Sequence, residues 1–365
     1  MFDYKSNPGK HIYPDCSDFN GDTFDSTFDK VVATHFFYWW REYMYANFIY
    51  QPTYPIEKYL WDSINWWRYE LDSIQKTGID ALLLCYNAYK TDEWSSNKGL
   101  VLLDLFLESN SRDLKFGMFF NTSEIVNNKI DLSLEENLPL FYYPIQDFFS
   151  RINPKYWFRW DGRIVVVLYS SNHAKGFHNN LFEYAREQFG NDFNGSELFI
   201  VGDKGWERDG IITIDATNEW GCGLYGVKQT DVINVAPGYK DIRPKIRDRE
   251  DGQYYLHNWT VAKAYNPLFI IIETWNELFE GTQIENTIEL GNHYSILTKK
   301  EINNYKFNNK LIMNCYQKLL KRNPSKSEFI DYLYLLNSEK AKPFDIIKGF
   351  INSGEFKEVY NFGLL

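Results

Sequence analysis

Two glutamates three positions apart, Glu277 and Glu280, are the residues of this chain best suited to chemistry. They lie in the segment 271–285, IIETWNELFEGTQIE, which starts as an apolar strand and ends in a polar run. Two neighbouring carboxyl groups suit cleavage of a glycosidic bond, because one protonates the departing oxygen while the other acts as base or nucleophile. Their mutual repulsion separates their pKa values, so one stays protonated near neutral pH. Glutamates that cap a helix or form salt bridges have the same spacing, so spacing alone decides nothing.

Eight short apolar runs, with helical or loop segments between them, provide the elements that would position these glutamates. Near-continuous apolar runs are typical of strands buried on both faces of a parallel sheet. Their number and total length predict a (β/α)8 barrel of the TIM type. The predicted strands are 31–39, 80–87, 115–122, 163–170, 198–203, 210–218, 231–239 and 268–277.

Two of the connections between these strands are too short for a full crossover helix. Lys204–Asp209 separate the fifth and sixth strands, and the Gly-rich segment Glu219–Thr230 separates the sixth and seventh. A parallel crossover normally needs a dozen residues or more. We therefore expect a barrel that lacks helices around strands five to seven, with an open doubly wound sheet as the alternative fold.

The composition changes after the last predicted strand. A polar-rich helix is expected over Asn304–Arg322, and Ser325 and Glu328 then have the spacing of a capping box before an apolar helix. We interpret residues 1–302 as the barrel domain and residues 303–365 as a small all-α module. The same helices could also be the terminal helices of the barrel.

The carboxyl ends of the strands build the active site of a (β/α)8 barrel, so polar and aromatic residues there are candidate substrate contacts. Core packing is the alternative role for each of them. Glu273 lies four residues before Glu277, on the same strand face, and we expect it to be structural or to lie just behind the site, where it could pair with a cation such as an arginine. The candidate substrate-binding residues are His35, Tyr38, Trp39, Asn87, Asn121, Tyr169, Asp215, Tyr239, Trp275 and Asn276.

Composition and charge narrow the class of ligand. Aromatic residues make up 18% of the chain, and their faces stack on the apolar faces of sugar rings. The net charge of −10 disfavours a nucleic acid partner. The four cysteines, Cys16, Cys85, Cys222 and Cys315, have no metal-binding spacing, and no apolar stretch is long enough to span a membrane. The chain as written has no signal peptide, which predicts a cytoplasmic protein, or a periplasmic or secreted one if a leader was removed.

The motif TWNELFEGTQIE resembles the WNEW-x-EGTQIE signature of glycoside hydrolase family 99 and its family-99-like relatives. Three further stretches, DGRIVVVLY from Asp161, APGY from Ala236 and RDREDGQYYLHNW before the last strand, are similar to family segments in the same order. The resemblance covers roughly residues 30 to 295. Two features depart from the family pattern. Leu278 and Phe279 replace the residues that follow WNE in the family, and the first strand reads THFFYWW where the family has a tyrosine- and proline-rich end.

The resemblance implies a mechanism. Members of the family are retaining endo-α-mannosidases or mannanases that use the substrate's own 2-hydroxyl and form a 1,2-anhydro sugar. The glutamate matching Glu277 would be the general base on that hydroxyl, and the one matching Glu280 the general acid/base at the glycosidic oxygen. The substrate would be an oligo- or polysaccharide, and no metal or organic cofactor is implied. The departures leave the sugar open.

We therefore expect an enzyme, a retaining endo-acting glycoside hydrolase that cleaves an α-linked glycan, with mannose-containing chains as candidates. The first alternative is a glycosyltransferase of bacterial surface polysaccharide (O-antigen-type) assembly, although we find no DxD motif at a strand end and no Gly-rich phosphate loop. The second is a non-catalytic glycan-binding barrel, which would not need both glutamates. The stretch from Cys315 to Phe356 resembles a small helical domain of unknown function found on bacterial carbohydrate and surface proteins.

Overall fold

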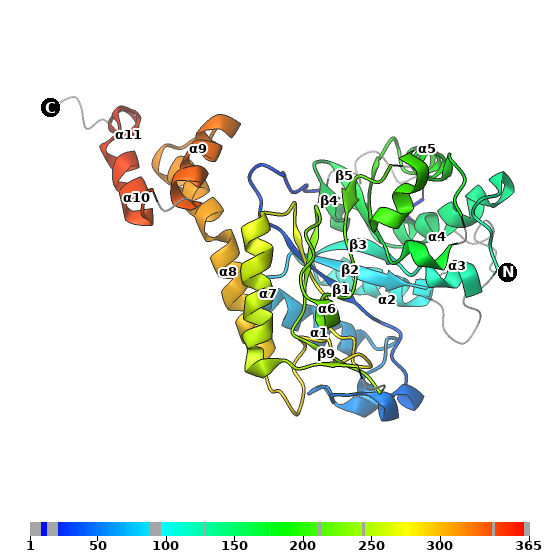
Figure 1. Cartoon of the computed structure of the whole chain (residues 1–365). Helices are drawn as coiled ribbons and strands as arrows, with labels where there is room; N and C mark the ends of the chain where they lie inside the picture. The colour runs from blue at the N-terminus through cyan, green and yellow to red at the C-terminus, as the bar shows by residue number, and fades with distance from the viewer. Residues whose placement is uncertain are drawn as a thin grey trace.

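The computed structural model of the chain describes residues 9–12, 21–87, 96–127, 129–174, 176–210, 213–242, 245–337 and 340–360. A curled parallel sheet with the strand order β7-β6-β5-β3-β2-β1-β11-β8 forms its centre (Figure 1). All eight predicted strands are present, and one short antiparallel strand, β4, is added beside β5. The strands are β1 (Val32–Phe36), β2 (Ala81–Tyr86), β3 (Lys115–Phe120), β4 (Arg159–Trp160), β5 (Arg163–Leu168), β6 (Leu198–Gly202), β7 (Ala216–Thr217), β8 (Ile233–Val235) and β11 (Ile270–Ile272).

The two edge strands, β7 and β8, meet and close the sheet. The Val232 amide donates to the Thr217 carbonyl at 2.9 Å, and the Asn218 side-chain amide donates to the Asn234 side-chain oxygen at 2.7 Å. A sheet whose edges join in this way is a barrel, which confirms the TIM-type prediction over the open doubly wound sheet. A second, two-stranded sheet follows β8 and consists of β9 (Tyr239–Lys240) and β10 (Ile246–Arg247).

Helices connect most of the barrel strands, as the sequence predicts. Ser63 caps the first of them, and the chain leaves it through Gly78, whose φ of +86° lies in the left-handed region. The α-helices between strands are α1 (Ile64–Thr77), α2 (Ser96–Ser109), α3 (Ser123–Asn127), α4 (Leu138–Ser150), α5 (Leu181–Asp192), α6 (Cys222–Tyr225) and α7 (Gln253–Tyr265). Short 3-10 helices cover 42–47, 56–58, 135–137, 154–156, 171–173, 204–210 and 250–252.

The barrel has few helices between β6 and β8, as the short connections in the sequence predict. In the described part of the two connections, the 3-10 helix Lys204–Gly210 is the one helix between β6 and β7, and the four-residue α6 is the one helix between β7 and β8. Elsewhere the core is dense because every residue of β1, β2 and β3 is buried. Large aromatic side chains from the helices, such as Trp66, Trp67 and Phe149, fill the layer around the sheet.

The long helix α8 (His293–Asn314) leads from the barrel to the C-terminal helices, which lie at the upper left of Figure 1. These are the π-helical turn Cys315–Leu319, α9 (Lys326–Asn337), α10 (Pro343–Asn352) and α11 (Gly354–Val359). They enclose a second hydrophobic cluster that begins at Ile312, whereas Ile302 still belongs to the barrel core. The boundary that we predict between residues 302 and 303 falls inside α8, and the division into two domains stays a prediction.

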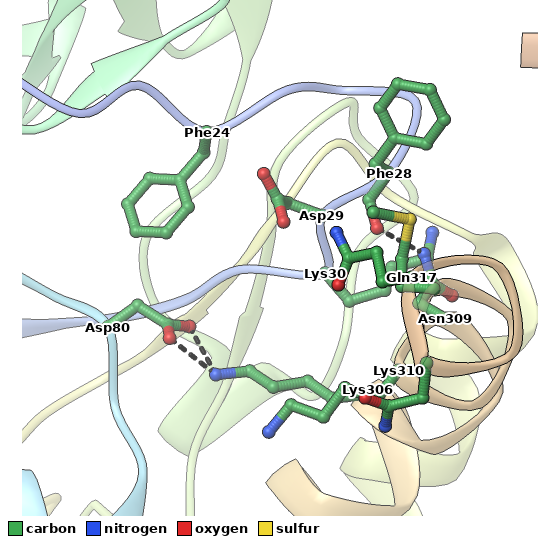
Figure 2. Close-up of a pocket in the computed structure, with 11 residues that line it drawn as sticks. Phe24, Phe28, Asp29, Lys30, Asp80, Lys306, Asn309, Lys310 and Gln317 are labelled. Atoms are coloured by element: carbon green, nitrogen blue, oxygen red, sulfur yellow. Dashed lines mark hydrogen bonds and ion pairs between the residues drawn. The ribbon is translucent and has the colours of Figure 1, made fainter. Parts of the chain in front are cut away.

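Polar contacts hold α8 against the amino end of the barrel (Figure 2). Lys306 Nζ lies 2.6 Å from both carboxylate oxygens of Asp80, the residue before β2, and 3.0 Å from the Gly78 carbonyl. The Asn309 amide donates to the Phe28 carbonyl at 2.9 Å, and the Phe28 ring packs edge-on against Phe329 of α9. The N-terminal segment, the barrel and the C-terminal helices therefore meet at this point.

Candidate active site

The candidate site is a pocket at the carboxyl ends of the barrel strands, with a volume of about 200 Å³. Both predicted catalytic residues, Glu277 and Glu280, line it, and none of the described residues that line it is a lysine or an arginine. The other lining residues are Phe37, Trp39, Cys85, Phe119, Asn121, Ser123, Tyr169 and Trp220. Two carboxyl groups thus face a space whose other walls are mainly aromatic.

A single loop after β11 carries both carboxyl groups. Its two ends pair through the backbone, because the Glu285 amide donates to the Trp275 carbonyl at 2.9 Å. Between these ends the Lys240 amide donates to the Glu280 carbonyl at 2.9 Å, which ties the loop to β9. The Arg249 guanidinium, itself buried, donates to the carbonyl of Gly281 at 2.8 Å. The loop is therefore held at its base and along its far side.

The Glu277 carboxyl group is buried, with 5% of the residue exposed. Its Oε1 accepts the Phe279 amide at 3.0 Å, and its own amide donates to the Thr274 hydroxyl at 2.9 Å. Burial raises the pKa of Glu277 well above the ordinary range, and the nearby carboxyl group of Glu280 raises it further. A carboxylate in such a place is a stronger base than one in water.

Tyr169, at the end of β5, lies close to the carboxyl groups. Burial raises its pKa to about 12, and the charges of Glu280 and Glu273 act in the same direction. The phenol therefore keeps its proton at neutral pH. It can donate that proton in a hydrogen bond to a hydroxyl of a bound ligand.

Aromatic rings form the opposite wall of the pocket. Phe119 and Trp220 stack with their centroids 5.3 Å apart and an interplanar angle of 12°, and Tyr169 meets both edge-on. His35 lies behind this wall, 4.2 Å from the Phe119 ring and 4.9 Å from the Trp220 ring, and is completely buried. Burial lowers the pKa of His35 to about 3, so its imidazole is neutral at physiological pH.

The structure brings three predicted substrate contacts to the pocket, namely Trp39, Asn121 and Tyr169. Two others lie just behind the lining. Asn87 is buried and accepts a hydrogen bond from the Asn121 amide at 2.5 Å, and His35 supports the aromatic wall.

The remaining predicted contacts lie away from the pocket lining. Asp215 precedes β7, so it sits at the amino end of the barrel, where it forms ion pairs with Arg163 at 2.6 Å and Arg186 at 3.0 Å. The prediction places Asp215 within a strand over 210–218, whereas β7 spans only Ala216–Thr217 and begins after Asp215. Tyr239 belongs to the β9–β10 hairpin. Its hydroxyl donates to Asp241 at 2.9 Å.

Tyr38, Trp275 and Asn276 turn into the protein interior. The Tyr38 ring packs on Trp67 at 5.6 Å. The Asn276 side chain is completely buried and bonds both the amide and the carbonyl of Phe37 at 2.8 Å, so it joins the end of β11 to the end of β1. Trp275 donates its indole N–H to Glu70 of α1 at 2.7 Å.

Glu273 has the structural role that we expect but not the expected partner. Its carboxylate accepts the backbone amides of Gly221, Cys222 and Gly223 and the side chain of Asn234, rather than an arginine. Burial raises the pKa of Glu273 to about 7, and these four donors act in the opposite direction. The carboxyl group therefore fixes the short helix α6 beside the site.

Sequence reasoning missed five lining residues: Phe37, Cys85, Phe119, Ser123 and Trp220. Trp220 follows β7 by three residues, and the rule that pointed to the other strand ends could have found it. Phe37 and Phe119 look like core residues because apolar side chains surround them in the sequence. Cys85 is buried and lines the pocket too.

Among the described residues, no group of three or more His, Cys, Asp or Glu side chains is arranged to hold a metal ion, and Cys16 lies outside them. None of the described helices is long and apolar enough to cross a membrane.

The sequence profile of a family described as Domain of unknown function (DUF5010) matches residues 16–313. The chain belongs to this family. A second profile, Domain of unknown function (DUF4214), matches residues 296–360 and agrees with the resemblance of the C-terminal helices to such a domain. The two matches overlap within α8. No curated protein matches the chain.

Solved structures with the same fold include two of the family 99 endo-α-mannosidase of Bacteroides thetaiotaomicron. The one with bis-tris-propane is 16% identical over 77% of this chain and 98% of that chain, with a TM-score of 0.57. The other is 15% identical over the same shares, with a TM-score of 0.56. A glycoside hydrolase-like protein is 16% identical over 78% of this chain and 98% of that one, with a TM-score of 0.56. These structures confirm the resemblance at the level of the fold.

Proposed function

We propose that this member of the family is a retaining, endo-acting glycoside hydrolase that cleaves an α-linked glycan. The observation that carries the proposal is that Glu277 and Glu280, on one loop, line the same aromatic pocket at the carboxyl ends of the barrel strands. A glycosidase needs two carboxyl groups beside one sugar, and stacked rings such as Phe119 and Trp220 suit a sugar's apolar face. The shared fold with an endo-α-mannosidase makes mannose-containing glycans the first substrates to test.

In the first step the Glu277 carboxylate takes the proton of the 2-hydroxyl, and that oxygen attacks the anomeric carbon. The glycosidic bond breaks as Glu280 gives its proton to the departing oxygen, which leaves a 1,2-anhydro sugar. In the second step Glu280 takes a proton from water, the water oxygen attacks the anomeric carbon, and Glu277 returns its proton to O2. Two inversions give net retention, and both carboxyl groups regain their starting states.

The raised pKa of Glu277 fits the role of base. A carboxylate that prefers to hold a proton removes one from an alcohol more readily than an ordinary carboxylate does. The same shift limits activity at low pH, because the reaction starts only from ionised Glu277. The uncharged aromatic surroundings that raise this pKa also exclude water from the reacting atoms.

The assignment of the acid is tested with the Glu280→Gln variant on substrates of different leaving group. Departure of a sugar alkoxide needs a proton, so the variant should cleave a natural glycan about 10³-fold more slowly than wild type. Departure of an activated phenolate needs little help, so the loss on an aryl glycoside should be much smaller. Equal residual activity on both substrates would remove Glu280 from the role of acid.

A further inference from the structure

Behind the pocket lies a second pair of carboxyl groups, formed by Glu70 of α1 and Glu285 at the end of the loop that bears Glu277 and Glu280. Glu70 is completely buried and Glu285 is 3% exposed. Two carboxyl groups in the interior are costly unless their charge is neutralised and their oxygens are hydrogen-bonded. Their surroundings show how this cost is met.

Each carboxyl group accepts one strong hydrogen bond through its Oε2 atom. The Trp275 indole N–H donates to Glu70 at 2.7 Å, and the Tyr59 hydroxyl donates to Glu285 at 2.6 Å. The two carboxyl groups are also near enough to each other that one could donate to the other if it held a proton. Neither Oε1 atom receives a hydrogen bond from another donor within the part of the chain that the structure describes. Two carboxyl groups can share a hydrogen bond only when one of them holds a proton.

Among the described residues, no lysine, arginine or histidine is among the main influences on the pKa of either carboxyl group. Three tyrosines lie near the pair: burial raises the pKa of Tyr54, Tyr59 and Tyr69, and the charge of Glu70 raises each further, joined by Glu285 at Tyr59 and Tyr69. A proton held between the two carboxyl groups, rather than an ion pair, would neutralise one of the two charges.

Hydrogen bonds connect the pair to both ends of the loop that carries Glu277 and Glu280. The side chain of Trp275, at its first end, is bonded to Glu70, while Glu285 is its last residue and pairs with Trp275 through the backbone. Asn276 adds a further contact between the loop and Tyr59, because its side-chain amide donates to the Tyr59 hydroxyl at 3.4 Å. The hydrogen bonds of these two carboxyl groups and their donors therefore connect helix α1 and Tyr59 to the loop.

We propose that Glu70 and Glu285 are a positioning pair, which shares one proton and holds the loop ends so that Glu277 and Glu280 face one pocket. Their part in catalysis rests on the proposed function, whereas their hold on the loop does not. A displacement of about 1 Å in such a loop costs about 10²-fold in rate, so the pair would matter to the reaction although it touches no substrate.

The direction of the pKa shifts agrees with a shared proton. Burial raises the pKa of Glu70 to about 7, and burial together with the neighbouring Glu70 raises the pKa of Glu285 well above its ordinary range. Both values are raised relative to the unfolded chain, so the stability that the pair contributes is full at acidic pH. It is lost as the pH rises through about 7 and beyond, when both groups are charged.

The test compares wild type with Glu285→Gln and Glu70→Gln, with Glu187→Gln as the matched control because Glu187 is an exposed glutamate of α5. An amide replaces the proton-bearing carboxyl group and donates at any pH. The thermal midpoints of wild type and Glu187→Gln should therefore fall between about pH 6 and about pH 9 by clearly more than those of the two other variants. Parallel curves for all four proteins would overturn the shared proton.

Hydrogen exchange of the peptide 275–285 measures the hold on the loop without any substrate. Folded Glu285→Ala should exchange this peptide about tenfold or more faster than wild type, because the lost hydrogen bonds let the loop open, and Glu285→Gln should restore most of the protection. Unchanged exchange in Glu285→Ala would overturn the positioning role. Should that variant not fold, the same comparison is made between wild type at about pH 6 and about pH 9, with Glu285→Gln as the reference.

A kinetic measurement separates this inference from the proposed function. On a glycan that wild type cleaves, Glu285→Ala should lower kcat about tenfold or more with little change of KM, and Glu285→Gln should recover most of kcat. An unchanged kcat in Glu285→Ala would contradict a role in catalysis. A wild type that cleaves no glycan would remove the proposed function, and the exchange and melting experiments would still decide whether the pair holds the loop.

Discussion

Selected acidic side chains at the two ends of the barrel have different neighbours. At the amino end, carboxylates are paired with cations, as in Asp80 with Lys306 and Asp215 with Arg163 and Arg186. At the carboxyl end, Glu277 and Glu280 lie together in a pocket whose described lining includes no lysine or arginine. Removing one partner of a paired charge destabilises a fold, whereas like charges gathered among aromatic rings cost stability and are typical of functional sites.

The clearest test of this difference is to neutralise one carboxylate at each end of the barrel. Glu277→Gln should lower the rate of glycan cleavage by about 10³-fold and leave stability at mildly alkaline pH equal to or above that of wild type. The reason is that the folded-state pKa of Glu277 is raised, so its ionised form destabilises the protein as the pH rises. Kinetics and thermal melting of the same preparation measure both effects.

Asp215→Asn is the matched change at the amino end. It removes the charge that holds two arginines, so it should lower the free energy of unfolding by about 1–2 kcal/mol and leave kcat of the folded protein unchanged. A large loss of kcat in Asp215→Asn, or none in Glu277→Gln, would contradict the division of roles between the two ends.

The aromatic wall should govern substrate binding rather than the chemical step. Trp220→Ala removes one face of the stacked pair with Phe119, so we expect KM to rise about tenfold with a smaller effect on kcat. Trp220→Phe is the control, since it keeps a flat ring and should restore most of the affinity. Equal KM values for all three proteins would show that the sugar does not lie on this wall.

The pH dependence of kcat/KM sharpens the account of the carboxyl pair. Because Glu277 must be ionised to act as base, kcat/KM should rise with pH through its raised pKa, at a higher pH than for an ordinary glutamate. Glu280 must hold a proton when it acts as acid, so Glu280→Gln, assayed on an aryl glycoside that needs no acid, should keep this acid limb and lose the fall of kcat/KM at higher pH. A fall at higher pH that persists in Glu280→Gln would contradict the role of Glu280 as acid.

The smallest effect on activity is expected from the junction shown in Figure 2. Lys306→Met leaves Asp80 without its cation, so the free energy of unfolding should fall by about 2–3 kcal/mol while kcat stays the same. Lys310→Met on the same helix is the control, because Lys310 is exposed and should tolerate the change. Chemical denaturation of both variants measures the difference.

Much of this architecture could be predicted because buried parallel strands leave continuous apolar runs in the sequence. The same runs placed Glu277, Trp39, Asn121 and Tyr169 near strand ends, where the pocket lies. Side-chain direction was harder to predict. Trp275 and Asn276 point inward because the chain turns back at Glu285, and the sequence gives no sign of that backbone pairing.

Strand length and long-range partners set the remaining limits. Asp215 looked like a strand end because an apolar run precedes it, but the strand starts only at Ala216 and pairs there with β6. Glu70 gave no signal at all, since a glutamate on an amphipathic helix is normally exposed. Only the packing of α1 against the loop after β11 shows that it meets Glu285.

Release of products shows whether Glu277 and Glu280 cleave a glycan. Wild type and the Glu277→Gln/Glu280→Gln double variant are incubated with α-mannans and bacterial surface glycans, and released oligosaccharides are read by mass spectrometry. We expect wild type alone to release oligosaccharides, by internal cleavage and with a retained anomeric configuration. Release by the double variant as well, or no release from any glycan by wild type, would contradict it and direct the next test to sugar nucleotides as substrates of a transferase.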